Sequence, residues 1–146
     1  MPSVRPADPA DVDALVEAYG WLFAAPAAGP PPTWDAEAAG ERLRALIASD
    51  TGAVFVGDDL GGFVTVYLDI LSVRYGQRAW VEDLAVDPAR RSQGLGKALL
   101  DTAKDWARER GASHLELDSA FARGDAHRFY EREQPSWDAR SFGWLL

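Results

Sequence analysis

The sequence predicts one α/β domain, residues 1–146, in which a single mixed, mostly antiparallel central sheet is flanked by helices. A chain of 146 residues has room for one hydrophobic core and is short for two. Hydrophobic residues make up 47% and charged residues 26%, which is the balance of a globular protein rather than of a disordered or fibrous one. Along the chain, apolar residues at helical spacing alternate with short runs rich in β-branched and aromatic residues.

The first third of the chain predicts a short strand and then two helices. The strand ends near residues 4–5. The first helix follows because Asp8 can cap it, Pro9 suits its first position and Asp11 complements the helix dipole. Its apolar face is expected to consist of Val12, Leu15, Val16, Tyr19, Leu22 and Phe23. After a proline-rich loop, a second helix is expected over residues 34–49, with inward-facing Leu43, Leu46 and Ile47.

The rest of the chain predicts strands interleaved with helices. Three strands are expected over residues 52–56, 62–70 and 79–86, and the turn between the first two indicates an antiparallel hairpin. Pro88 ends the third strand because proline supplies no ladder donor. Then come a helix, a strand, a helix and a last strand, over residues 94–110, 114–118, 125–133 and 141–146.

Composition excludes several classes of site. Cysteine is absent, so disulfides, thiolate metal ligands and a cysteine nucleophile are excluded. Two histidines make no convincing metal site, and no metal is expected. The N-terminal residues lack the apolar core of a signal peptide, and the longest uncharged stretch, residues 18–34, contains four prolines. We therefore expect a cytoplasmic protein that does not engage a membrane.

The charge is acidic overall but unevenly placed. A net charge of −8 argues against nucleic-acid binding. Residues 1–87 carry 5 basic and 14 acidic side chains, whereas residues 88–146 carry 10 basic and 9 acidic ones. Three cations, Arg90, Arg91 and Lys97, lie within eight positions beside two glycines. This local gathering of cations indicates a phosphate-binding segment.

Residues 90–97, between the third long strand and its helix, have the features of a diphosphate-binding loop. Glycine lets the backbone approach a ligand closely, and the free N–H groups of a first helical turn bind anions. A P-loop would require glycine in place of Arg91 and a hydroxyl residue in place of Ala98. A dinucleotide fingerprint that starts at Gly94 would require glycine or alanine in place of Leu99. Neither motif fits.

A different combination of motifs does fit. Arg91-x-x-Gly94-x-Gly96 follows a strand that ends in VEDLAVDP at residues 81–88, and AHRFYER follows at residues 126–132. Together with the order of strands and helices, these segments resemble the GNAT superfamily of acyl-CoA-dependent N-acetyltransferases over nearly the whole chain. The glycine motif alone is weak, but the three segments at this spacing are specific.

The resemblance implies acetyl-CoA as the acyl donor and direct transfer to an amine, in agreement with the absence of cysteine. In the family, the loop and the helix N-terminus hold the CoA diphosphate through backbone amides, and a backbone N–H of the third long strand polarises the thioester carbonyl. The pantetheine arm is expected between this strand and residues 115–119. The implied cofactor-binding residues are Leu84, Ala85, Val86, Arg91, Ser92, Gln93, Gly94, Leu95, Gly96 and Lys97.

Two residues take catalytic roles by the same resemblance. Tyr130 corresponds to the family's general acid, and a phenol can protonate a leaving thiolate because its ordinary pKa is the higher of the two. The alternative is an aromatic core residue beside Phe129. Glu82 is the candidate base, acting through water, and the alternative is a solvated carboxylate at a strand start. Asp83 is the less favoured base, and on a regular strand it faces away from Glu82.

One segment departs from the family pattern. Relatives usually show Gly-Phe soon after the Tyr-Glu pair, where this chain reads Glu133-Gln134-Pro135. The C-terminal turn must therefore be built differently, and the far edge of the sheet is expected to be altered or shortened.

The acceptor is expected to be a primary amine. In the family, acceptors enter beside the first two helices, and this half of the chain carries the excess of acidic residues, which favours a cationic small molecule, a lysine or an N-terminal amine. The alternative is that the acidity serves solubility. The alternative function is a non-catalytic acyl-CoA sensor of the same fold. Because members of the family are often dimers, the resemblance also allows a homodimer.

Overall fold

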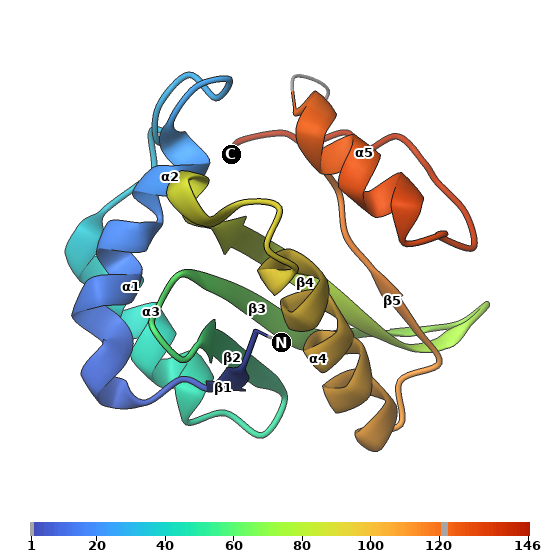
Figure 1. The fold of residues 1–146 in the computed structure, drawn as a ribbon. Coiled ribbons are helices and arrows are strands. Elements are labelled where there is room, and N and C mark those ends of the chain that lie inside the picture. The colour runs from blue at the N-terminus through green and yellow to red at the C-terminus, as the bar shows by residue number, and fades with distance from the viewer. Residues whose placement is uncertain (1, 121–122) are drawn as a thin grey trace.

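The computed structural model describes residues 2–120 and 123–146 and shows one sheet with helices on both faces (Figure 1). The five strands lie side by side in chain order, so each strand is hydrogen-bonded to the next. The pairs from β1 to β4 are antiparallel, and only β5 runs parallel to its neighbour β4. Their bounds are Val4–Pro6 (β1), Gly52–Gly57 (β2), Gly62–Ser72 (β3), Gly76–Val86 (β4) and His114–Glu116 (β5). The expected α/β fold with a mixed, mostly antiparallel sheet is confirmed.

The helices begin where the sequence supplies caps. The Asp8 side chain accepts a hydrogen bond from the Ala10 N–H, and the Asp11 carboxylate, held by Arg5 at 2.7 Å, accepts one from the Asp8 N–H. The expected first helix is interrupted at Tyr19, which divides it into α1 and α2. The helices are Pro9–Asp11 (η1), Val12–Ala18 (α1), Gly20–Phe23 (α2), Ala36–Ile47 (α3), Pro88–Arg90 (η2), Leu95–Glu109 (α4) and Gly124–Arg132 (α5).

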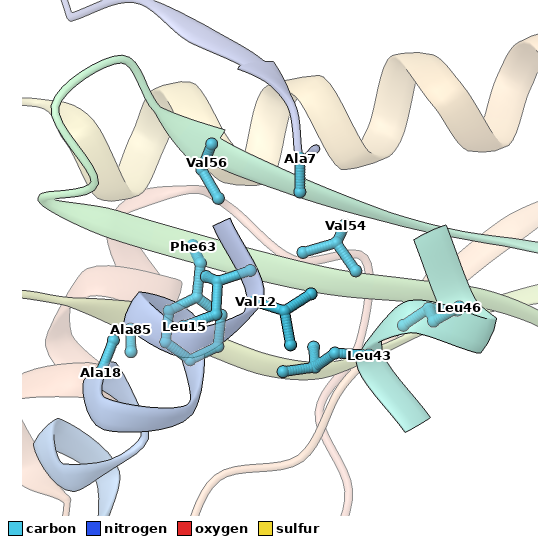
Figure 2. Packing of buried hydrophobic residues seen from close by; sticks show 10 residues of the cluster. All are labelled: Ala7, Val12, Leu15, Ala18, Leu43, Leu46, Val54, Val56, Phe63 and Ala85. Carbon is cyan, nitrogen blue, oxygen red and sulfur yellow. The ribbon is translucent and has the colours of Figure 1, made fainter. Parts of the chain in front are cut away.

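The core has two parts, one on each face of the sheet. Figure 2 shows the part in which Val12 and Leu15 of α1 and Leu43 of α3 pack against Val54 and Phe63 of the strands. On the opposite face lies α4, whose apolar residues at helical spacing are buried against the sheet: Leu95, Leu99, Ala103 and Trp106. Burial of a large apolar side chain contributes roughly 1.5–3 kcal/mol to the free energy of folding. The packing on each face therefore fixes where α1 and α4 lie on the sheet.

The expected last strand is wrong. Residues 133–146 follow α5 without helix or strand, and β5 is the outermost strand on its side among the described residues. Phe142 and Trp144, which alternate as they would on one face of a strand, are 72% and 81% exposed. Alternation of apolar residues is a local property, whereas a strand also needs a neighbouring strand to pair with. The turn that would return the chain to the sheet is built differently here, as the missing Gly-Phe pair indicated.

That turn contains a residue in an unfavourable backbone conformation. After α5 ends, Gln134 adopts φ of 55°, the left-handed region that glycine occupies without penalty.

Replacing Gln134 with glycine is expected to raise the free energy of unfolding by about 1 kcal/mol and the melting temperature by about 2–4 °C. Thermal unfolding followed by circular dichroism measures this shift. Gln134→Ala, which retains a Cβ, is the control and should leave the melting temperature near that of the wild type; an equal rise in both variants would contradict the explanation.

Candidate active site

The first turn of α4, which follows the loop from β4, presents backbone amides that have no side-chain cap. The Asp87 carboxylate accepts a hydrogen bond from the Ala89 N–H at 2.9 Å and starts the short helix η2. The chain then reaches α4 through Ser92 at φ 65° and Gly94 at φ 85°. No side chain caps α4, so the N–H groups of its first turn stay available for an anion. This geometry suits the diphosphate predicted from the sequence.

The three cations near this loop differ in their partners. Arg90 forms an ion pair with Asp59 in the turn between β2 and β3. Lys97 Nζ lies 3.1 Å from the Glu133 carboxylate at the end of α5. Arg91 is exposed and forms no ion pair with another described residue. A phosphate at this loop would therefore meet backbone amides and the Arg91 side chain. Lys97 would contribute its backbone N–H, because its ammonium group is paired with Glu133.

Beside the loop, β4 and β5 separate. They pair only over residues 78–80 and 114–116, and among the described residues nothing pairs with the outer edge of β4 beyond that point. The chain after β5 instead leads to α5, which lies across from the end of β4 (Figure 1). A Cβ added to Gly96 would lie 3.7 Å from both Val86 and Phe129, so the end of β4, the start of α4 and α5 meet here. The structure thus gathers the predicted residues from Leu84 to Lys97 at one end of the molecule.

Tyr130 of α5 is partly buried next to Phe129, whose ring centroid lies 5.2 Å away. Burial raises the pKa of the Tyr130 phenol above its ordinary value of 10.0; the nearby Arg123 opposes this and Asp118 adds to it. The phenol is therefore protonated at neutral pH. That is the state a proton donor requires, and it is equally the state of a core tyrosine.

A β-bulge places the two adjacent carboxylates on one face. Thr65 pairs with Asp83, but the next residue, Val66, pairs with Val81, so Glu82 is an extra residue on β4 without a partner on β3. A bulge bends the strand and re-aims its side chains. Glu82 and Asp83 both act on the same two tyrosines, Tyr19 and Tyr67, whose pKa values their charges raise in addition to burial.

The environments of the two carboxylates are different. Glu82 is exposed, and its carboxylate accepts a hydrogen bond of 2.9 Å from the Trp80 indole N–H. Asp83 is mostly buried, and its Oδ2 accepts hydrogen bonds from the Tyr19 hydroxyl at 2.6 Å and from the Thr65 hydroxyl at 3.1 Å. Burial raises the pKa of Asp83, and these two hydrogen bonds oppose that rise. Of the two carboxylates, Glu82 is the more exposed.

The expectation that Glu82 and Asp83 lie on opposite faces is wrong, because it assumed a regular strand. The residues of β4 that pack with α4 show the shift. They are Ala79 and Val81 before the bulge and Leu84 and Val86 after it, so they change from odd to even numbers, and Ala85 packs in the core on the other face. That change of phase across the Glu-Asp pair was the sequence signal for the bulge. Tyr19 gave no such signal, since it lies 64 residues from Asp83 in the chain.

The described residues contain neither a membrane-spanning helix nor a cluster of metal ligands. No helix within residues 2–120 and 123–146 combines the length and the apolar character needed to span a bilayer. No group of three or more histidine or carboxylate side chains suited to a metal ion occurs in the same part of the chain.

Comparison with known proteins identifies the family. Residues 15–134 match the model of the acetyltransferase (GNAT) family. An uncharacterized N-acetyltransferase, YhdJ of Bacillus subtilis, is 47% identical over 60 residues, which are 41% of this chain and 42% of that protein. The streptothricin acetyltransferase of Streptomyces lavendulae is 39% identical over 80 residues, 55% of this chain and 40% of the relative. The chain thus matches about two fifths of the length of these curated relatives.

Solved structures share the fold. A transcriptional regulator from Bacillus halodurans superposes with a TM-score of 0.85 at 20% identity, with both chains fully covered. The aminoglycoside N-acetyltransferase AAC(6')-Iy, crystallised with CoA, superposes with a TM-score of 0.80 at 15% identity over 100% of this chain and 95% of that one. The motifs, the sheet that opens between β4 and β5, and the match over residues 15–134 agree, and the chain belongs to the GNAT acetyltransferase family.

Proposed function

We propose that the protein is an N-acetyltransferase that moves the acetyl group of acetyl-CoA directly to a primary amine, either on a cationic small molecule or at a lysine or N-terminal position. The uncapped start of α4, reached through Ser92 and Gly94 in left-handed conformation, carries this proposal. A diphosphate fits this loop because its charge complements the free N–H groups and the helix dipole. Family membership supports the same cosubstrate.

In this proposal each group of the chain has one task. Acetyl-CoA supplies an activated acyl group as a thioester. Glu82 takes a proton from the acceptor ammonium through water, which leaves a neutral amine to attack the carbonyl carbon. A backbone N–H among residues 84–86 donates a hydrogen bond to the carbonyl oxygen as negative charge develops there. The carbon–sulfur bond then breaks, and Tyr130 donates its proton to the leaving thiolate. The newly acylated nitrogen loses its remaining proton through water, which restores the Tyr130 phenol and leaves a neutral amide and the CoA thiol.

The charge of the chain supports a cationic acceptor, and the relatives support an amine. The first 87 residues, which supply the face opposite α4, carry 5 basic and 14 acidic side chains. A field of that sign concentrates positively charged ligands. Relatives include an aminoalkylphosphonate N-acetyltransferase and, among solved structures, aminoglycoside acetyltransferases, whose named acceptors contain amino groups.

An amine panel tests this function. With acetyl-CoA as donor, CoA release is expected to be faster by roughly tenfold or more with spermidine, kanamycin or poly-lysine than with glycinamide, because the acidic half attracts the more cationic acceptors. Equal rates would contradict the charge argument. Calorimetric binding of acetyl-CoA without CoA release on any amine would instead favour an acyl-CoA sensor, and absence of binding would overturn the proposed function.

A further inference from the structure

Asp83 is a mostly buried carboxylate without a positively charged partner among the described residues. Arginine and lysine side chains form ion pairs elsewhere on the described chain, but none of these pairs includes Asp83. Its hydrogen-bond donors are two neutral hydroxyls, those of Tyr19 and Thr65. A buried negative charge is costly unless it is paired with a cation. The charge on Asp83 is therefore a cost that a bound cation would offset.

One oxygen of this carboxylate is held and the other is open. Both hydroxyls donate to Oδ2, which fixes the orientation of the group. Oδ1 accepts no hydrogen bond from a described residue. Because no fully buried side-chain oxygen or nitrogen in the described part of the chain lacks a partner, Oδ1 must touch solvent. The carboxylate thus presents one fixed oxygen to a ligand.

The surroundings of Asp83 suit an organic cation. The side chains of Tyr67 and Trp80, opposite each other on β3 and β4, lie on the face that carries Asp83 and are only partly buried. On the helix side, the Tyr19 ring lies 5.5 Å from that of Trp34, which is also partly buried. Aromatic faces attract alkylammonium groups and cover their methylene chains. This face combines an unpaired carboxylate with partly exposed aromatic rings.

We propose that Asp83 determines acceptor specificity by binding, through Oδ1, a second ammonium group of the acceptor, distinct from the amine that is acylated. The proposal rests on the proposed acetyltransferase function. The acylated amine is excluded as the partner of Asp83 because a fixed carboxylate stabilises the protonated form of an amine and so opposes its attack. The reacting nitrogen must be neutral, and Glu82, at the exposed bulge position beside Asp83, takes its proton.

Two matched acceptors test the assignment on the unmodified protein. 1,5-Diaminopentane and 5-amino-1-pentanol have the same length and the same reacting amine, but one ends in an ammonium group and the other in a hydroxyl. The diamine is expected to have a kcat/KM roughly 10-fold to 100-fold higher, mainly through a lower KM, which is the effect of one charge-assisted hydrogen bond. Equal kcat/KM values with measurable transfer to both would overturn the Asp83 proposal and leave the proposed function standing. Transfer to neither these nor any other amine would remove both.

The variant Asp83→Asn tests whether the Asp83 side chain causes the preference for the diamine over the amino alcohol. The amide retains the shape and can still accept from Tyr19, and the substitution removes the cost of a buried charge, so the protein is expected to fold. The preference for the diamine is expected to fall to about twofold or less, with little change for the amino alcohol. Glu41→Gln, which removes an exposed charge on α3, is the matched control and should retain the preference. A preference that survives in Asp83→Asn, or disappears equally in Glu41→Gln, would assign it to the general acidic field and overturn the proposal. If Asp83→Asn fails to fold, equal kcat/KM values of the wild type for the two acceptors still overturn the proposal.

Discussion

Replacing Gly94 with glutamate is expected to weaken acetyl-CoA binding by about 100-fold or more. Gly94 is the residue immediately before α4, and no side chain caps the helix there. A carboxylate at this position would occupy the uncapped N–H groups and repel the diphosphate. Isothermal titration calorimetry with acetyl-CoA measures the change, and circular dichroism checks that the variant is folded.

Gly94→Ala is the matched control for this substitution. At φ of 85°, both variants place a Cβ in the left-handed region, which costs about 1–2 kcal/mol, and that Cβ would lie 3.6 Å from Pro2. The two variants should therefore lose similar amounts of stability, and only the glutamate should lose most of the affinity. Unchanged affinity in folded Gly94→Glu would mean that the diphosphate binds elsewhere.

Replacing Tyr130 with phenylalanine is expected to lower kcat by about 100-fold or more, the usual range for a general acid, while the Kd for acetyl-CoA stays near that of the wild type. The substitution removes the hydroxyl of the proposed proton donor and retains the aromatic ring beside Phe129. Tyr75→Phe makes the same chemical change at a residue that is 55% exposed between β3 and β4, and it should leave kcat unchanged. Equal activity in wild type and Tyr130→Phe would assign Tyr130 to packing.

The pH dependence of the same step follows from the direction of the Tyr130 pKa. Burial raises this pKa above 10.0, so the phenol retains its proton throughout the neutral and mildly alkaline range. The wild-type kcat is therefore not expected to fall through loss of this proton between about pH 7 and pH 9. A decline centred in that range, absent from Tyr130→Phe, would contradict the raised pKa.

Local signals were enough to predict most of the fold. Helical spacing and the Asp8 cap placed the start of the first helix, and the glycine-bounded apolar runs placed β2 and β3 within two residues of their observed ends. The last strand was wrong because Phe142 and Trp144 alternate as in a strand but have no neighbouring strand to pair with. Alternation describes a chain segment, and pairing depends on the rest of the molecule.

The features of the candidate site that depend on local backbone conformation could be predicted from the sequence. The features that depend on contacts between distant segments could not. The loop from Arg91 to Gly96 could be proposed from the sequence alone, because glycines at a helix start let a ligand approach the free N–H groups of the first turn. The bulge at Glu82 changed which side chains share a face, and only the phase of the apolar residues hinted at it. The hydrogen bond from Tyr19 to Asp83 joins α1 to β4 over 64 residues, and no local pattern encodes such a contact.

Titration of acetyl-CoA into ¹⁵N-labelled protein, followed by amide NMR, tests the central assignment most directly. The largest shifts are expected at the N–H groups of residues 94–97, with a second group at residues 84–86, because these amides meet the diphosphate and the thioester. Saturable binding that moves other amides and leaves both groups unchanged would contradict the assignment, and the roles given to Glu82, Asp83 and Tyr130 would be lost with it.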